Sequence, residues 1–89
     1  MDKSIIIPLN LFKLDQEILI ADQDNCRTFA YAGLADLPEV VVEASRAYDI
    51  DQVKLIGNGN YAEAISSEIT EYLITNYSEK KLNISIMEA

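Results

Sequence analysis

Short apolar and β-branched runs separated by polar clusters predict three strands in the first third of the chain. Residues 4–9 form the first run, which ends near Pro8 because proline cannot donate a hydrogen bond to a neighbouring strand. Residues 16–22 and 26–32 form the next two runs, and the polar turn DQDN separates them. Strands joined by so short a turn pair antiparallel, so the second and third runs predict a hairpin.

Apolar residues next recur at intervals of three and four, which predicts two amphipathic helices. Asp36 is expected to cap the first helix, with Pro38 in its first turn and Glu39 completing a capping box. Asn60 is expected to cap the second helix, with Glu63 in the corresponding position. The apolar stripes are expected at Leu37, Val40, Val41, Ala44, Ala47 and Tyr48, and at Ala62, Ile65, Ile69, Tyr72 and Leu73.

A strand follows each predicted helix, at residues 52–56 and 82–87, so the predicted order is β-β-β-α-β-α-β. A strand, a helix and a strand in succession imply a right-handed crossover and parallel pairing. We therefore expect one two-layer α/β domain over residues 1–89. Its mixed five-stranded sheet has the order 3-2-1-4-5 with the second strand antiparallel, and both helices cover one face, which leaves the other face open.

This order of elements resembles the core of the ribonuclease H-like superfamily, which also forms each half of the actin-like ATPases. In residues, the likeness lies in VKLIGNGNYAEAISSEI, which looks like the strand, glycine turn and helix that contact adenosine in those ATPases. The resemblance implies metal-binding carboxylates on the first strand and near the fourth. Here the first strand offers Pro8 and Asn10, and the fourth offers Lys54 and Asn58. These departures argue against nuclease chemistry and ATP hydrolysis.

The glycine turn at the start of the second predicted helix is the candidate ligand site, because free N–H groups and the helix dipole favour a phosphate there. Its G-x-G-x-x-A spacing also matches a dinucleotide-binding fingerprint, with Glu88 available for a ribose hydroxyl. Glu63 opposes this by bringing a negative charge to the helix start. We expect the glycines to serve a tight turn, and small-molecule or nucleotide binding is the alternative. The residues concerned are Gly57, Asn58, Gly59, Asn60 and Tyr61.

Fifteen acidic and seven basic residues give a net charge of -8, spread along the whole chain. A negative charge of this size repels nucleic acid and anionic membranes and favours basic protein partners, although a role in solubility alone also accounts for the charge. No apolar run reaches the roughly 18 to 20 residues that cross a bilayer. We expect a cytoplasmic protein without direct nucleic-acid or membrane binding, and the Ile, Asn, Lys and Glu content is typical of a bacterial or bacteriophage chain.

The residue types that most often carry catalysis or bind metal are scarce in this chain. Histidine is absent and Cys26 is the single cysteine. No nucleophile with a base, and no set of metal ligands, can be assembled from the remaining residues by their spacing. We therefore expect no enzyme activity, no catalytic residue, no metal and no cofactor.

Alternation along the strands predicts that the open face of the sheet is partly apolar and partly polar. A face of this kind is typical of a homodimer or partner interface, and a half-solvated sheet face remains the simpler alternative. The predicted interface residues are Leu19, Lys54, Ile56, Ser85 and Met87. We expect a small acidic protein that acts through protein contact, as a homodimer, and as a regulator or inhibitor of a basic, nucleic-acid-binding partner.

Overall fold

The computed structural model describes residues 3–88. The elements are β1 (Ser4–Pro8), β2 (Asp15–Ala21), β3 (Cys26–Gly33), α1 (Leu37–Ala47), β4 (Gln52–Ile56), α2 (Gly59–Asn76) and β5 (Asn83–Met87). Their order is the predicted one, and each strand begins and ends within one residue of its predicted bounds. No helix in the described part of the chain is long and apolar enough to cross a membrane.

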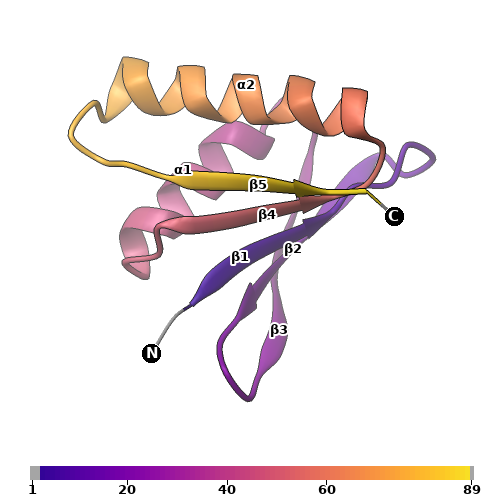
Figure 1. Ribbon diagram of the computed structural model, residues 1–89, viewed down its shortest axis with the longest axis horizontal. Coiled ribbons are helices and arrows are strands. Elements are labelled where there is room, and N and C mark those ends of the chain that lie inside the picture. Colours follow the sequence, from indigo (N-terminus) through magenta and orange to yellow (C-terminus); the bar gives the residue numbers. More distant parts are fainter. Residues whose placement is uncertain (1–2, 89) are drawn as a thin grey trace.

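The five strands form one mixed sheet in the order β3-β2-β1-β4-β5, as predicted. β2 pairs antiparallel with β1 and with β3, whereas β4 pairs parallel with β1 and with β5. In Figure 1, α1 lies behind the sheet and α2 runs along β5, in a layer of their own. The α/β architecture therefore has two layers, with β1 as the central strand.

The core lies between this sheet and the helices. Ile5 and Ile7 of β1 and Val53 and Leu55 of β4 are fully buried, because alternate residues of a strand point to the same face. Lys54 lies between the two buried residues of β4 and is exposed on the other side. The described structure thus has one covered, apolar face and one face that no helix covers.

The start of α1 differs from the prediction. Asp36 is the N-cap residue, but its side chain accepts no capping hydrogen bond, so the predicted capping box with Glu39 is wrong. The backbone of Asp36 is already helical, with φ -97° and ψ -10°, whereas a capping side chain works from extended backbone. Its N–H group instead donates to the carbonyl oxygen of Gly33 at 3.0 Å.

The buried side of α1 is also rotated from the predicted stripe. Val42 and Ser45 are buried, whereas Ala47 and Tyr48 are exposed. α1 contacts α2 as well as the sheet, so its buried arc is wider than one stripe. The Ser45 hydroxyl is satisfied there because it donates to the Val42 carbonyl oxygen at 2.7 Å. The Tyr48 ring instead packs edge-on against Phe29, with 5.2 Å between ring centroids.

α2 begins earlier than predicted. Asn58 is the N-cap, and its side-chain oxygen accepts from the N–H groups of Asn60 and Tyr61 at 3.1 and 3.2 Å. The predicted cap at Asn60 is therefore wrong, and Glu63 falls beyond the third helical position. Gly57, with φ +155°, makes the turn that ends β4 and leaves Asn58 in the extended conformation that a cap requires. The predicted stripe of α2 is buried, except that Tyr72 is half-buried.

Candidate functional site

The glycine turn brings its five predicted ligand residues together at the start of α2, beside the end of β5. Gly57 donates its N–H to the Met87 carbonyl oxygen at 2.9 Å. A Cβ atom at Gly59 would collide with the Glu88 carboxylate, so this acid lies over the turn. Asn58 already accepts from two of the N–H groups that a phosphate would use. Ligand binding here stays the alternative to a simple turn, and the Glu88 carboxylate lies where a phosphate would approach.

Candidate metal ligands are dispersed over the described part of the molecule. Among residues 3–88, no three His, Cys, Asp or Glu side chains are grouped so that they could hold a metal ion. Cys26 is exposed at the start of the edge strand β3. The remaining candidate sites in the described part of the chain are surfaces and grooves.

The predicted interface residues all lie on the face of the sheet that no helix covers. The strand register sets Lys54 beside Ser85 and Ile56 beside Met87. Leu19 lies across from Ile6, which is itself beside Lys54. We call this surface the open face, and its residues are Ile6, Pro8, Glu17, Leu19, Thr28, Tyr31, Lys54, Ile56, Ser85 and Met87.

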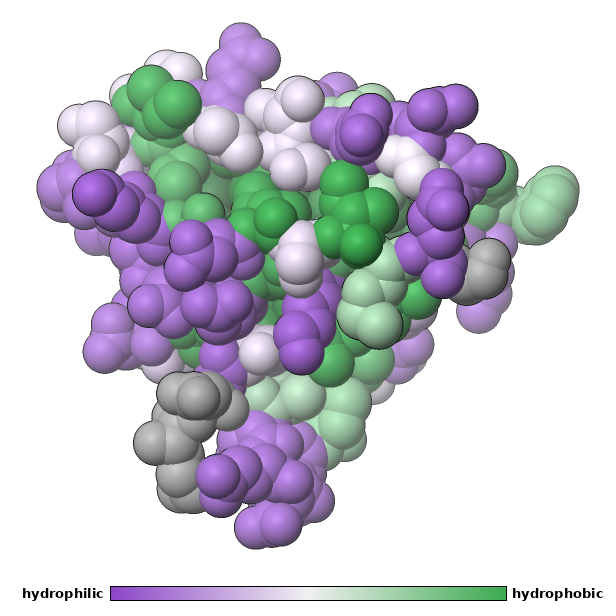
Figure 2. Space-filling model, in the orientation of Figure 1, coloured by the Kyte–Doolittle hydropathy of each residue, from purple (hydrophilic) through white to green (hydrophobic). Residues whose placement is uncertain are grey.

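The open face is most apolar in its middle. Ile6, Leu19 and Ile56 are half-buried although no helix lies over them, whereas Met87 is 53% exposed. Figure 2 shows hydrophobic atoms across β1, β4 and β5, with hydrophilic atoms interspersed and around them. Ile6 of the central strand was missing from the predicted interface, although its alternation with Ile5 and Ile7 contains the signal.

A second apolar surface was not predicted. The connection between β1 and β2 exposes Leu11, Phe12 and Leu14, which are 61%, 97% and 92% exposed. We call residues 11–14, with the sequence Leu-Phe-Lys-Leu, the apolar loop. Figure 1 shows this connection reaching out beyond the sheet, and Figure 2 shows hydrophobic atoms projecting there. Three large apolar side chains this exposed form an apolar patch, the kind of surface through which proteins often contact partners.

The buried side chain of Gln16 makes hydrogen bonds to the backbone at the apolar loop. The side chain of Gln16 donates to the carbonyl oxygens of Asn10 and Lys13, at 2.8 and 3.0 Å. Its oxygen accepts from the N–H of Asn10 at 2.6 Å. Gln16 is 1% exposed, so these backbone groups are satisfied by the side chain and not by water. The loop is therefore an ordered feature of the fold.

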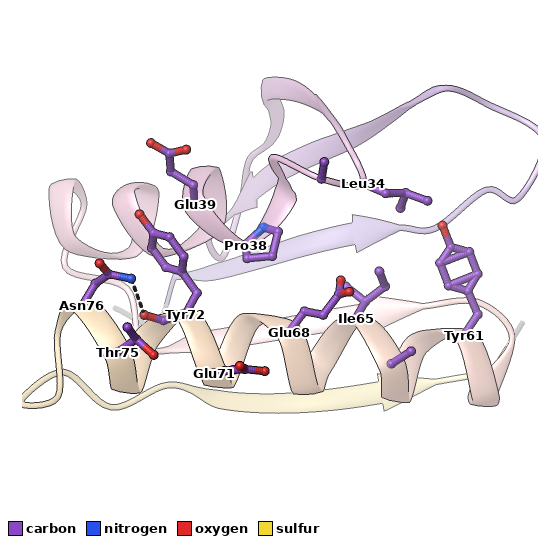
Figure 3. Close-up of a pocket in the computed structure, with 12 residues that line it drawn as sticks. Leu34, Pro38, Glu39, Tyr61, Ile65, Glu68, Glu71, Tyr72, Thr75 and Asn76 are labelled. Atoms are coloured by element: carbon purple, nitrogen blue, oxygen red, sulfur yellow. Dashed lines mark hydrogen bonds between the residues drawn. The ribbon is translucent and has the colours of Figure 1, made fainter.

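A groove of about 570 Å³ separates α2 from α1 and the segment before it. Its lining residues are Leu34, Ala35, Pro38, Glu39, Tyr61, Ala64, Ile65, Glu68, Glu71, Tyr72, Thr75 and Asn76. Figure 3 shows Tyr61 and Tyr72 towards the two ends of the groove, both rising from α2, with Glu68 between them and Pro38 opposite. Sequence reasoning did not predict this groove, because its two sides come from distant segments.

Three carboxylates, those of Glu39, Glu68 and Glu71, line the groove. Burial raises the pKa of the Tyr61 hydroxyl, and the neighbouring Glu68 carboxylate raises it further. Burial also raises the pKa of Tyr72, with Glu39 and Glu43 as the next causes. Both pKa values rise because burial, and then a nearby carboxylate, disfavour a negative charge on the tyrosine oxygen.

One end of the helix pair is joined by a small polar cluster. The Tyr77 hydroxyl donates to Glu43 at 2.7 Å, and Arg46 lies 3.7 Å from the same carboxylate. The guanidinium of Arg46 also lies 3.8 Å from the centre of the Tyr77 ring. Arg46 is thus engaged by Glu43 and Tyr77, away from the glutamates of the groove.

No known protein-family description matches this chain, and a comparison with curated protein sequences finds no significant match. The ribonuclease H-like resemblance therefore stays a prediction that rests on topology and on the glycine turn. The open face, the apolar loop and the groove are interpreted from their own geometry.

Proposed function

We propose that the protein acts by protein–protein contact, as a homodimer joined through the open face, and not as an enzyme. One observation supports this proposal above the others: the central strand has a helix layer on one side only. On the other side Ile6, Leu19 and Ile56 form the middle of an uncovered surface. Covering such side chains yields about 25 cal/mol for each Å² of apolar area.

The charges on the open face suit a two-fold arrangement of two copies. β2 and β4 flank the central strand, and they carry Glu17 and Lys54 on the open face. A two-fold axis parallel to β1 places β2 of one copy over β4 of the other. Leu19 and Lys54 are both level with Ile6, and Glu17 lies two residues along β2 from Leu19. Glu17 of each copy then lies roughly 7 Å along the strands from Lys54 of its partner, a separation that two long side chains can span, so the surface complements itself in charge as well as in apolar area.

A dimer of this kind keeps its helix layers on the outside. The net charge of -8 per chain then doubles, and the dimer presents acidic helices to other molecules. Charge of this sign favours a basic partner and repels nucleic acid. Regulation of a basic, nucleic-acid-binding protein therefore remains the form of protein contact that we propose.

The test is the mass of the native protein, measured by light scattering after size exclusion and by native mass spectrometry. We expect twice the chain mass of 10.0 kDa at concentrations of about 100 µM, since a weak homodimer assembles in that range. Leu19→Asp and Ile56→Asp should each give a folded monomer. Ile74→Asp, at a site on α2 that is 63% exposed and remote from the open face, should remain dimeric.

Two results would overturn this proposal. If the wild-type protein is a monomer at the highest concentration, the proposed homodimer is wrong. If the Leu19→Asp and Ile56→Asp variants are still dimeric, the interface lies elsewhere. The same mass spectra, recorded with a mixture of nucleotides and metabolites, test the alternative site. A stoichiometric adduct that Gly59→Glu abolishes would make the glycine turn the functional site.

A further inference from the structure

We infer that the groove between α1 and α2 binds an amphipathic helix of a partner protein, apolar along one side and carrying Lys or Arg beside it. The groove lies in the helix layer, on the opposite side of the sheet from the open face. This inference therefore does not depend on the homodimer and concerns a second surface of the molecule.

The length of the groove fits a helix. Its α2 side consists of residues that recur every three or four positions from Tyr61 to Asn76, so they form one continuous stripe. Fifteen steps at 1.5 Å per residue give a groove roughly 22 Å long. A partner helix of about four turns covers this length, and an amphipathic helix laid in a groove is a recurring mode of peptide recognition.

The walls of the groove require apolar side chains from the occupant. Leu34 is 40% exposed on one wall, and Ile65 is buried beneath the other. Tyr61 and Tyr72 are half-buried, and Figure 3 shows both rings rising from α2 into the groove, with their hydroxyls pointing away from α2. Aromatic rings with a polar tip bind apolar side chains and still hydrogen-bond at the rim.

The rim of the groove requires positive charge from the occupant. Glu39, Glu68 and Glu71 line it, and among the described residues none of the three forms an ion pair. Within residues 3–88 no Lys or Arg lines the groove, and α2 contains neither. A phosphate-bearing ligand would be repelled, whereas Lys or Arg on the flanks of a helix would set its orientation and speed its association.

The experiment measures binding of a synthetic peptide to the full chain by fluorescence anisotropy. The probe is a labelled helical peptide of about 18 residues with Leu at helical spacing and Lys at the flanking positions. Two control peptides are a scrambled sequence of the same composition and a version with Glu in place of Lys. We expect the first peptide to bind at least about tenfold more tightly than either control, and its affinity to fall with salt.

Two charge reversals on α2 distinguish binding in the groove from attraction by the net charge of the protein. Glu68→Lys, inside the groove, should weaken binding by about tenfold or more. Glu63→Lys changes the net charge equally but lies outside the groove, so its effect should be less than about threefold. Leu34→Asp should also abolish binding, whereas Ile74→Asp, an equivalent change on an exposed residue of α2, should not.

Several outcomes would overturn the inference. Equal losses in Glu68→Lys and Glu63→Lys, or equal affinity for the scrambled peptide, would mean attraction by net charge alone. Amide chemical shifts that move on the open face, and not at Leu34 and Tyr72, would place the peptide elsewhere. Leu19→Asp should bind the peptide normally, so failure of the groove and failure of the proposed homodimer give different results.

Discussion

Gln16 and Asn10 are joined by two hydrogen bonds across the β1–β2 connection. The Gln16 amide nitrogen donates to the Asn10 carbonyl oxygen at 2.8 Å, and the Gln16 oxygen accepts from the Asn10 N–H at 2.6 Å. The buried Gln16 side chain thus takes the place of a backbone hydrogen-bond partner for this connection. The connection therefore presents Phe12 and Leu14 to water from a hydrogen-bonded backbone, and fixing the backbone in advance lowers the conformational entropy that any binding at these side chains would cost.

Gln16→Leu should therefore destabilise the protein. The change removes the hydrogen-bond partner of the partly buried Asn10 N–H and of the Lys13 carbonyl oxygen, whereas the Asn10 carbonyl oxygen keeps the Lys13 N–H at 3.3 Å. Such a loss costs about 1 to 3 kcal/mol in the free energy of unfolding. Urea denaturation followed by circular dichroism measures this. Gln23→Leu is the matched control, because Gln23 is exposed in the β2–β3 turn, and its stability should change by less than about 0.5 kcal/mol. Equal effects of the two changes would contradict the role of Gln16.

Asn58→Ala should destabilise α2, whereas Asn60→Ala should not. The Asn58 side chain accepts two N–H groups at the helix start, and loss of such a cap typically costs about 1 kcal/mol. Asn60 is exposed at the second helical position, so alanine there is neutral or slightly stabilising. Denaturation of the two variants measures the difference directly. The reverse ranking would restore the cap that the sequence alone suggested.

Ile69→Ala and Ile74→Ala remove the same atoms from two positions of α2. Ile69 is fully buried between α2 and the sheet, so its truncation should cost about 2 to 5 kcal/mol. Ile74 is 63% exposed, and its truncation should cost less than about 0.5 kcal/mol. Thermal unfolding provides the comparison, and similar costs at both positions would mean that α2 packs through a different face.

Stability should fall in alkali through the tyrosines of the helix layer. The hydrogen bond to Glu43 raises the pKa of Tyr77 above the ordinary value of 10.0, and burial adds to the increase. A folded-state pKa above the unfolded one gives stability that is fully present below about pH 10 and is lost as the pH rises through the folded-state value. Tyr61 and Tyr72 shift in the same direction.

Ultraviolet titration of tyrosinate, with denaturation at about pH 8 and about pH 11, measures this loss. Tyr77→Phe removes one of the shifted groups, so the variant should lose less stability than the wild type over the same interval. Tyr31→Phe removes an exposed tyrosine and serves as the control. A denaturation midpoint that rises between the two pH values would contradict the expected sign.

The topology could be predicted from the sequence because short connections and regular patterns leave few arrangements. The DQDN turn permits only a hairpin, and two strand–helix–strand units permit only parallel pairing in the second half. The first residue of a helix was harder to predict, for a physical reason. Asn58 and Asn60 are both good caps, and the choice depends on where the Gly57 turn releases the chain from β4.

The candidate surfaces were only partly predictable. The alternation of side chains along the strands identified the open face, because successive residues of a strand point to opposite faces of the sheet whatever covers those faces. The apolar loop has the composition of a core segment, and only the burial of Gln16 distinguishes it. The groove is lined by Glu39 of one helix and Glu68 of another, and no local pattern encodes the packing of two distant helices.

The central position of β1 affects how the chain assembles during synthesis. Ser4 pairs with Ala21 on one side and with Gln52 on the other, so β1 gains its second neighbour only after more than half of the chain has been made. Pairings this distant slow folding compared with local ones. Until α1 and β4 emerge from the ribosome, the β1–β2–β3 segment has both faces in water, and its isoleucines are then the part of the nascent chain most open to chaperones and to aggregation.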